Sequence, residues 1–465
     1  MALDSVIAVN RFGLGAGPGE LAAAAADPRG WLAKQAGEPA PAYLEFSKLA
    51  HSSEALKEYP RWIASLRPVR AGMQDSSSQG SRQAPRTVEE TFRGHFGPIM
   101  REEIGARLAA AAATPAPFQE RLVWFWANHF TVSAEKPLVF ALVGSFEREA
   151  IRPQVTGRFA DLLLAAARHP AMIFYLDNHR SVRQGWQPLR PARSAAFPSP
   201  TGLNENLARE ILELHTLGVN GGYTQADVTE FARVLTGWTV RAQGSPGFLF
   251  DPARHEPGTR TLLGRTYAQD GVAQGEAVLR DLAAHPATAL HVATKLARHF
   301  IADEPPPQAV ARIARAFSDT DGDLPSVYAA LLDCPEAWER PLAKLKTPIE
   351  YVVSCLRALP ALRTAQPQAL FFTLRGMGQR PFFAPSPQGW PDTTQAWAGA
   401  DALWKRIEWS GIVAARAGSG VDPLHLASES YGDALGAATR RAIERAESRQ
   451  QGLALWLASP EFQRR

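Results

Sequence analysis

Apolar residues return at intervals of three and four along most of this sequence, as in FQERLVWFWANHF (118–130) and GRFADLLLAAARHPAMIFYLDN (157–178). That period matches one face of an α-helix. Strand-like alternation is confined to residues 247–267, where two short runs flank a connection that contains Pro and Gly. We therefore predict a mainly α fold, a large multi-helix globular body with one small β-hairpin near 247–267.

The chain has 465 residues, more than one typical core requires. We predict a single elaborated helical domain over 1–465, whose only candidate internal boundary is the polar, serine-rich linker 67–88. Two further stretches interrupt the helical pattern. Residues 180–202 form a basic, Pro-rich loop, and residues 376–392 form a loop of prolines and aromatics. Loops of these two kinds often frame a functional site.

Charge and cysteine content exclude several classes of protein. Lys and Arg number 50 against 46 Asp and Glu, which gives a formal charge of only +4. Since the basic residues are not concentrated, neither nucleic-acid binding nor membrane binding is indicated. Two cysteines exclude a disulfide framework, and no apolar run is long enough to span a membrane. The N-terminus has no signal-peptide pattern, so we predict a cytoplasmic location.

NENLAREILELHTLG (204–218) places three glutamates, an arginine and a histidine within about four helical turns. On a helical wheel Glu205, Arg209, Glu210 and Glu213 share the polar side. Two interpretations stay open. The glutamates form a solvated salt-bridge ladder with Arg209, or Glu205, Glu210 and Glu213 face a site as ligands or general bases.

Histidines are the other candidates for chemistry. His215 lies on the apolar side of the same helix, His129 lies among bulky aromatics, and His255 follows the first β run. Asp177 and Asn178 end a very apolar helix. Each has a structural alternative, since a buried histidine can bond to carbonyls and an Asp-Asn pair can end a helix. As a functional set they are the ligands of a carboxylate–histidine metal site, with Asp177, Asn178 and His255 on the metal.

ALHVATKLARHF (289–300) places His291, Lys295, Arg298 and His299 along one helix face. A solvated basic face is one interpretation, and a docking face for an anionic substrate is the other. We also expect Asn204, Asn206, Arg209 and Trp390 to contact substrate. The chain has neither a GxSxG nucleophile motif nor a complete calcium-binding loop.

Long blocks of the sequence carry a family resemblance. Among them are NRFGLGAGPGEL, WFWANHFTVS, YLDN, NENLAREILELHTLGVNGGYTQADVTEFARVLTGW, HPATALHVATKLARHF, GWPD and LASPEFQRR. Through them the whole chain resembles the uncharacterised bacterial family named domain of unknown function 1800. The resemblance implies no assigned activity. It does imply a companion protein encoded nearby that commonly carries an export signal, so co-export with a partner is a further expectation.

Our leading hypothesis is an enzyme with a carboxylate–histidine site between helices around 204–215, with metal-assisted hydrolysis as its reaction class and a divalent metal ion as its cofactor. Glu205, Glu210, Glu213, His215 and His129 are its catalytic candidates. One alternative is a non-enzymatic assembly, cofactor-loading or export partner of the companion protein, which binds through aromatics near Phe382, Phe383 and Trp390. A weaker alternative is a polysaccharide- or peptide-binding module.

Overall fold

Helix-starting signals recur along the chain, and each sets where a helix begins. Thr347 and Glu350 form a reciprocal capping box in front of α18 (Pro348–Ala358), with Pro348 at its first position. The imidazole of His285 accepts a hydrogen bond from the Ala287 amide and begins α15 (Pro286–Phe300). The capping box expected from Thr224 and Asp227 begins α13 (Gln225–Val234). These local signals fix the two helices, α15 and α18, that matter most for the site.

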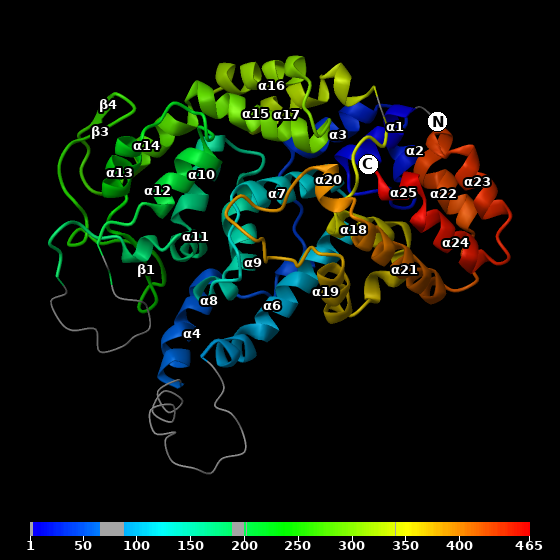
Figure 1. The fold of residues 1–465 in the computed structure, drawn as a ribbon, viewed down its shortest axis with the longest axis horizontal. Helices are drawn as coiled ribbons and strands as arrows, with labels where there is room; N and C mark the ends of the chain where they lie inside the picture. The colour runs from blue at the N-terminus through cyan, green and yellow to red at the C-terminus, as the bar shows by residue number, and fades with distance from the viewer. Residues whose placement is uncertain (1–2, 66–87, 188–199, 201, 340) are drawn as a thin grey trace, which may run out of the picture.

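The protein is described by a computed structural model, which covers residues 3–65, 88–187, 200, 202–339 and 341–465 (Figure 1). The N-terminal part contains α1 (Leu3–Ile7), η1 (Ala8–Phe12), α2 (Glu20–Ala24), α3 (Pro28–Gly37), η2 (Leu44–Phe46), α4 (Ser52–Ser65), α6 (Val88–Ala113) and α7 (Pro117–His129). The next segment contains α8 (Pro137–Phe140), α9 (Val143–Phe146), η3 (Glu147–Ile151), η4 (Arg152–Gln154), α10 (Phe159–Arg168), α11 (Pro170–Tyr175) and η5 (Asn178–Arg180).

The central part continues with α12 (Asn206–Glu210), η6 (Ile211–His215), α13, α14 (Val272–Ala283), α15, α16 (Pro307–Asp319) and α17 (Leu324–Leu332). The C-terminal part contains η7 (Pro335–Ala337), α18, η8 (Pro360–Thr364), α19 (Pro367–Gly376), α20 (Thr394–Trp397), α21 (Ala400–Ala417), α22 (Pro423–Tyr431), η9 (Gly432–Ala434), α23 (Ala437–Glu444), α24 (Arg449–Ala458) and α25 (Pro460–Gln463). The prediction of a mainly α fold is confirmed.

Strands form two small antiparallel hairpins within the described residues. β1 (Trp238–Arg241) pairs with β2 (Gly247–Phe250), and β3 (Arg260–Leu262) pairs with β4 (Arg265–Tyr267). The predicted hairpin near 247–267 is therefore present as β3–β4. The first run of that stretch, 247–250, pairs with the preceding segment 238–241, because the short turn 242–246 closes a tighter connection than the longer segment 251–259 that follows.

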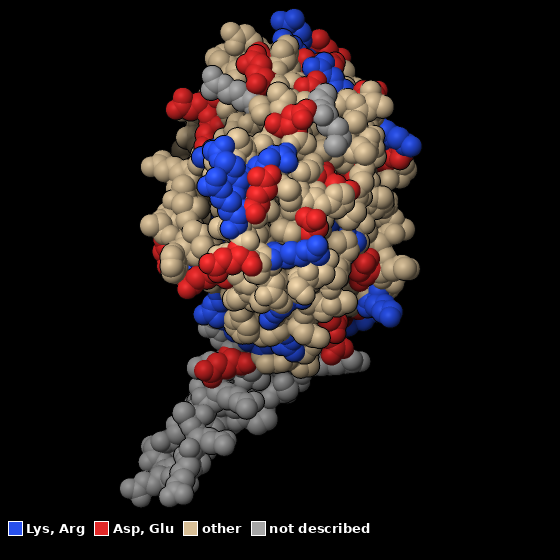
Figure 2. Space-filling view, turned by 90° about the vertical axis from the view of Figure 1, so that its right-hand side faces the viewer, with Lys and Arg blue, Asp and Glu red and all other residues tan. Residues whose placement is uncertain are grey.

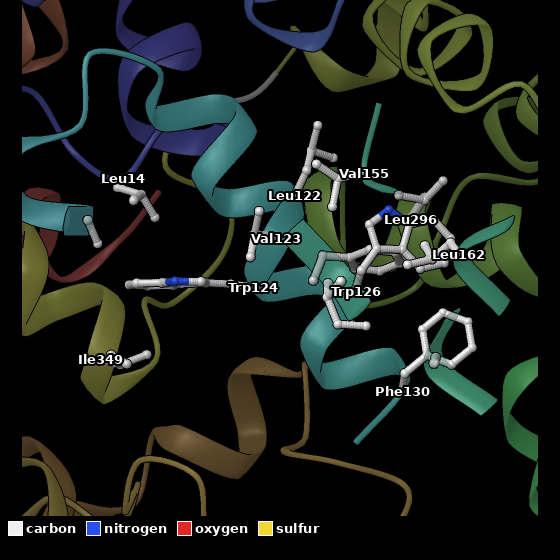
Figure 3. Packing of buried hydrophobic residues seen from close by; sticks show 14 of the residues in the cluster. Leu14, Leu122, Val123, Trp124, Trp126, Phe130, Val155, Leu162, Leu296 and Ile349 are labelled. Carbon is white, nitrogen blue, oxygen red and sulfur yellow. The ribbon is translucent and has the colours of Figure 1, made fainter. Parts of the chain in front are cut away.

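Buried hydrophobic residues form one connected cluster that extends from Val6 to Phe462. Helix α7 lies in its middle, with α15 on one side and α18 on the other (Figure 1). Trp124 and Trp126 point to opposite sides of α7, and Trp126 packs near Leu162 and Leu296 (Figure 3). Because α7 is buried nearly all round, its polar side chains face other elements of the protein.

Three of the irregular helices, η1, η3 and η6, are π-helical. π-Helical turns are rare and are found most often at functional sites. The last two supply Glu147 and Glu213 to the cavity described below. The periodicity of apolar residues in the sequence did not predict these π-helical turns.

Two of the predicted loops lie mainly outside the described residues. Of 67–88 only Val88 is described, and of 180–202 only 180–187, 200 and 202. The third, 376–392, is fully described and packs against α7. Figure 2 shows Lys and Arg interspersed with Asp and Glu on the face that it presents, without a continuous basic stripe. No helix in the described ranges has the length and apolar character that a bilayer crossing requires.

Candidate functional site

A cavity of about 560 Å³ lies where α7, α15, the start of α18 and the loop 377–393 meet. Helix α7 contributes Arg121, Trp124, Phe125, Asn128 and His129, which recur at helical spacing and so share one face. Leu122, Val123 and Trp126, on the other sides of the helix, pack into the hydrophobic core. One face of a buried helix thus becomes one wall of the cavity.

Helix α15 provides a second wall through His291, Lys295, Arg298 and His299. The sequence spacing of these four residues predicted that they share one face of the helix, and they do. The face does not lie in bulk water, because the loop before α20 covers it. The four side chains of this face line a cavity instead of a solvated surface.

The loop 377–393 is held on α7 by a two-point clamp. Asn128 Nδ2 donates to the carbonyl of Trp390 at 2.9 Å, and the Trp390 amide donates to Asn128 Oδ1 at 2.8 Å. Gly389, the residue before Trp390, has φ +84°, and a Cβ on it would lie 2.6 Å from two oxygens of Asn128. Only glycine fits such a close approach. The clamp places Phe382, Trp390 and Asp392 on the cavity wall.

Asp392 is the centre of a charged network at the floor of the cavity. Its Oδ2 accepts a hydrogen bond from Nδ1 of His299 at 2.7 Å. Arg465 and Lys344 lie within 3.6 Å and 3.8 Å of its other oxygen. Burial alone raises the pKa of Asp392, but His299, Lys344 and Arg465 lower it to about 2. Asp392 is therefore ionised at neutral pH.

The other carboxylates deep in the cavity are also shared between cations. Glu350 pairs with Arg121 and, at 3.2 Å, with Arg465. Glu147 pairs with Arg107 at 2.8 Å and with Arg152 at 3.7 Å. Burial opposes ionisation of Glu350, yet Arg465 and Arg121 hold its pKa far below the ordinary value. These carboxylates are fully used within the protein.

Lys295 and Arg298 are paired much less well. Neither forms an ion pair with any residue of the described chain, and Arg298 makes only a long hydrogen bond, 3.3 Å, to the carbonyl of Asp303. Burial lowers the pKa of Lys295 to about 8; Asp392 opposes this shift and Arg298 adds to it. The α15 wall therefore carries two cations without an ion-pair partner in the described chain, and Glu213 is the one carboxylate of the cavity lining that also has none there.

His299 has the geometry of an acid–base group. Burial lowers its pKa, with Asp392 opposing and Arg465 and Arg121 reinforcing the effect, so the imidazole is neutral at pH 7. Because the carboxylate accepts a hydrogen bond from Nδ1–H, Nε2 carries the free lone pair. Nε2 is buried and has no hydrogen-bond partner among the described residues. A base oriented by a carboxylate in this way is a recurring catalytic arrangement.

Three further histidines lie in or beside the cavity, and the imidazoles of two of them bond to backbone carbonyls. His129 donates from Nε2 to the carbonyl of His215 at 3.0 Å, and His291 donates from Nε2 to the carbonyl of Leu214 at 3.0 Å. Both carbonyls end the π-helical turn η6, where helical partners are missing. The ring of His129 lies 6.1 Å from the rings of both His215 and His291. The structural alternative for His129 is thus well supported.

Burial keeps all three of these imidazoles neutral. It is the main reason that the pKa of His129 lies well below 6.5 and that the values of His215 and His291 fall to about 3 and about 4. The nearby ammonium of Lys295 lowers each of them further. They therefore add no positive charge to that of Lys295.

The predicted site residues divide into two groups. His129, Glu213, Lys295, Arg298 and Trp390 line the one cavity, and His215 contacts His129 behind it. Glu205 lies away from it, where Thr229 donates to it at 2.7 Å and Arg209 pairs with it at 2.9 Å. Of the predicted ladder of Glu205, Arg209 and Glu213, only the Glu205–Arg209 pair forms among the described residues, and Glu213 lines the cavity.

The remaining predicted residues have local partners. Asn204 Oδ1 accepts from the Asn206 amide, which is a turn at the start of α12. Glu210 is half-buried, and burial followed by the charge of Glu213 raises its pKa. Neither Asn204, Asn206, Arg209 nor Glu210 lines the cavity.

The three proposed metal ligands are held in separate places. Asp177 pairs with Lys136 at 2.7 Å, Asn178 donates to the carbonyls of Leu235 and Trp238, and the imidazole of His255 bonds to the carbonyl of Thr236. In the ranges that the structure covers, no group of three or more His, Cys, Asp or Glu is placed to hold a metal ion. The geometry thus gives the predicted metal shell no common centre.

Sequence reasoning missed Asp392, Glu350, Arg121 and Arg465 as parts of the site. In the sequence, Asp392 looks like the polar end of a loop, the last residue of GWPD. Glu350 looks like an ordinary helix-capping residue. The one signal available for Asp392 was an acidic residue directly after a Pro- and aromatic-rich loop.

One comparison with known protein families covers nearly the whole chain. A family model described as protein of unknown function (DUF1800) matches residues 7–464. The chain belongs to this family. Membership confirms the resemblance carried by the long sequence blocks, and it assigns no activity. Searches among curated proteins and among solved structures found no similar protein.

Proposed function

We propose that this member of the family is an enzyme that binds a small organic anion in the cavity and uses His299 as its acid and base. One observation carries the proposal. Of the four carboxylates that line the cavity, Asp392, Glu350 and Glu147 each have two or more cationic partners, whereas neither Lys295 nor Arg298 has an ion-pair partner among the described residues. A ligand carboxylate or phosphate would supply the missing negative charge.

The size and lining of the cavity agree with a small ligand. A volume of about 560 Å³ falls within the usual range for small-molecule sites, about 300–1,000 Å³. Aromatic walls from Trp124, Phe125, Phe382 and Trp390 offer apolar contact beside the charged groups. A few polar groups among apolar walls is the composition typical of such sites.

His299 supplies the reactive part of the proposal. Its Nδ1–H donates to Asp392, which fixes the ring and leaves Nε2 as the base. With its pKa lowered, the imidazole accepts a proton from a bound substrate and returns it later. Asp392 acts here as the positioning residue.

Metal-assisted hydrolysis, our initial hypothesis, has less support than acid–base chemistry by side chains. It relied on Asp177, Asn178 and His255 as ligands, and each of these bonds to a different part of the protein. The enzyme hypothesis itself keeps its support, because ionisable groups converge in the cavity around His299 and Lys295.

The companion-protein alternative predicts an apolar docking surface at Phe382, Phe383 and Trp390. Phe383 is buried, and Phe382 and Trp390 line the cavity, where the guanidinium of Arg107 lies 5.3 Å from the Phe382 ring. These aromatics therefore favour a ligand site over a docking surface.

Thermal unfolding with a panel of anions tests the proposal. Phosphate, sulfate, acetate, citrate and pyruvate are each compared with chloride at equal ionic strength. We expect at least one of them to raise the Tm of the wild type, since a ligand that binds only the folded state stabilises it. The double variant Lys295→Met, Arg298→Gln should lose this response, and the surface variant Lys405→Met should keep it. Equal responses in the wild type and the double variant would overturn the proposal.

A further inference from the structure

Lys295 is surrounded by groups that leave its nitrogen free. The carboxylate that most affects it, Asp392, is already bound to His299 and shared with Arg465 and Lys344. The imidazoles of His129, His215 and His291 are neutral and close enough to sense its charge. Lys295 thus lies in the cavity wall without an ion-pair partner among the residues that the structure describes.

Lys295 and Arg298 lie one helical turn apart on α15 and differ in their chemistry. An arginine stays charged at any working pH and can grip a carboxylate with two parallel hydrogen bonds. A lysine can lose its proton and act as a nucleophile. Arg298 alone is enough to bind one ligand carboxylate. Of the two side chains, only Lys295 can also act as a nucleophile.

His299 completes the set because it follows Lys295 by four residues on the same face. Residues at this spacing lie about 5–6 Å apart at Cβ. Its Nε2 is free of hydrogen bonds within the described chain. The same wall therefore holds an amine (Lys295), an anion-binding guanidinium (Arg298) and a base (His299) within about one helical turn.

We propose that Lys295 forms a Schiff base with a 2-oxo acid whose carboxylate is bound by Arg298. This inference rests on the proposed function and names its substrate class. A 2-oxo acid carries its carbonyl next to its carboxylate, which matches an amine that lies one turn from a guanidinium.

The step balances without any external reagent. His299 Nε2 takes a proton from the Lys295 ammonium, and the freed lone pair attacks the carbonyl carbon, so that a C–N bond forms and the carbonyl π pair moves to oxygen. A proton passes from nitrogen to that oxygen and gives a carbinolamine. His299 then returns its proton to the hydroxyl, which leaves as water while the nitrogen pair forms the C=N bond. Ammonium and ketone have become iminium and water, with no net change in charge.

Reductive trapping tests the proposal. The full-length protein is incubated with cyanoborohydride and, in separate samples, pyruvate, 2-oxoglutarate, phenylpyruvate or the uncharged ketone butanone. Intact-mass measurement and peptide mapping then locate any reduced adduct. We expect a single adduct on Lys295 with at least one oxo acid, and its loss in Lys295→Arg, which keeps the charge. Arg298→Gln should lower trapping by the oxo acid by a larger factor than trapping by butanone, because only the oxo acid has a carboxylate for Arg298 to bind.

The outcomes separate this inference from the anion site itself. Calorimetry is run with the same oxo acids on the wild type and on Lys295→Arg. Binding without an adduct would overturn the Schiff base and leave the anion site standing. Neither binding nor adduct, in a protein that also fails to respond to the other anions, would overturn both. An adduct spread over surface lysines to the same extent as over Lys295 would also contradict the inference.

Discussion

The charge on Lys295 works against the stability of the folded chain. Its folded-state pKa of about 8 lies below the ordinary value of 10.5, chiefly because of burial. Between these two values the unfolded chain binds more protons than the folded chain, so stability rises with pH across that window. Below about pH 8 the full penalty is present.

Lys295→Met should therefore stabilise the protein at pH 7. We expect an increase of about 1–3 kcal/mol in the free energy of unfolding, since one pKa unit corresponds to about 1.4 kcal/mol and part of the side chain meets the cavity. The gain should shrink as the pH rises from 8 toward 10.5. Urea unfolding at several pH values measures both effects. A variant that is less stable than the wild type at pH 7 would show that Lys295 has a counter-ion that stabilises it.

Asp392 has the opposite linkage. Its pKa is lowered from 3.8 to about 2 by His299, Lys344 and Arg465 against the effect of burial. A lowered carboxylate pKa gives stability that is present above about pH 4 and is lost as the pH falls toward 2.

Asp392→Asn should destabilise the protein by about 2–3 kcal/mol at pH 7, because it removes the shared partner of three cationic or proton-donating groups. The difference between the variant and the wild type should narrow between pH 4 and pH 2. Denaturant unfolding across this range is the measurement. A difference that stays constant to pH 2 would mean that the carboxylate charge contributes nothing.

Among the elements, the loop 377–393 depends on one residue of α7. Asn128 makes both hydrogen bonds of the clamp to Trp390. A second contact, from the Ala134 amide to the carbonyl of Phe382 at 2.9 Å, holds the other end. Phe382 has φ +64°, a conformation that costs about 1 kcal/mol or more and persists only where neighbours enforce it.

Asn128→Ala should free the C-terminal end of this loop. We expect faster hydrogen exchange at the Trp390 amide, weaker anion binding, and a loss of about 1–3 kcal/mol in stability, because two hydrogen bonds are lost. Hydrogen exchange followed by mass spectrometry measures the first effect. Asn206→Ala, which removes an amide that lies outside the cavity, is the matched control. Unchanged protection at Trp390 would contradict the role assigned to the clamp.

The helices show what sequence periodicity can and cannot predict. Spacing placed His291, Lys295, Arg298 and His299 on one face of α15, and caps placed the start of α13, because both are local properties. Whether that face meets water or a cavity is decided by residues about ninety positions later, in the loop that Asn128 holds. Likewise, the wheel put Glu205 and Glu213 together, but the π turn η6 rotates Glu213 toward the cavity.

Taken as a whole molecule, the chain offers its candidate site at the meeting point of segments from distant parts of the sequence. Arg121, Lys295, Glu350, Asp392 and Arg465 are joined only by tertiary packing. A single sequence identified the mainly α fold and five residues that line the cavity. It could not show which carboxylates would be neutralised internally, and that property is what leaves Lys295 and Arg298 unpaired.

Metal removal should leave the protein unchanged if the site works through its side chains. The described residues hold no cluster of three His, Cys, Asp or Glu at metal-binding positions. We expect elemental analysis by mass spectrometry to find no stoichiometric metal in protein purified without chelator, and EDTA to leave the Tm and anion binding unaltered. A metal present at one equivalent and lost in His255→Ala would restore the metal hypothesis.

A crystal structure of the protein soaked in selenate tests the central claim most directly. Selenate is a small dianion with anomalous scattering, so it reports where the surplus positive charge lies. The account predicts an anomalous peak inside the cavity, within hydrogen-bonding distance of Lys295 Nζ and the Arg298 guanidinium, and its absence in crystals of the Lys295→Met, Arg298→Gln double variant. Peaks confined to the outer surface, with the cavity empty in the wild type, would show that the two cations do not form an anion site.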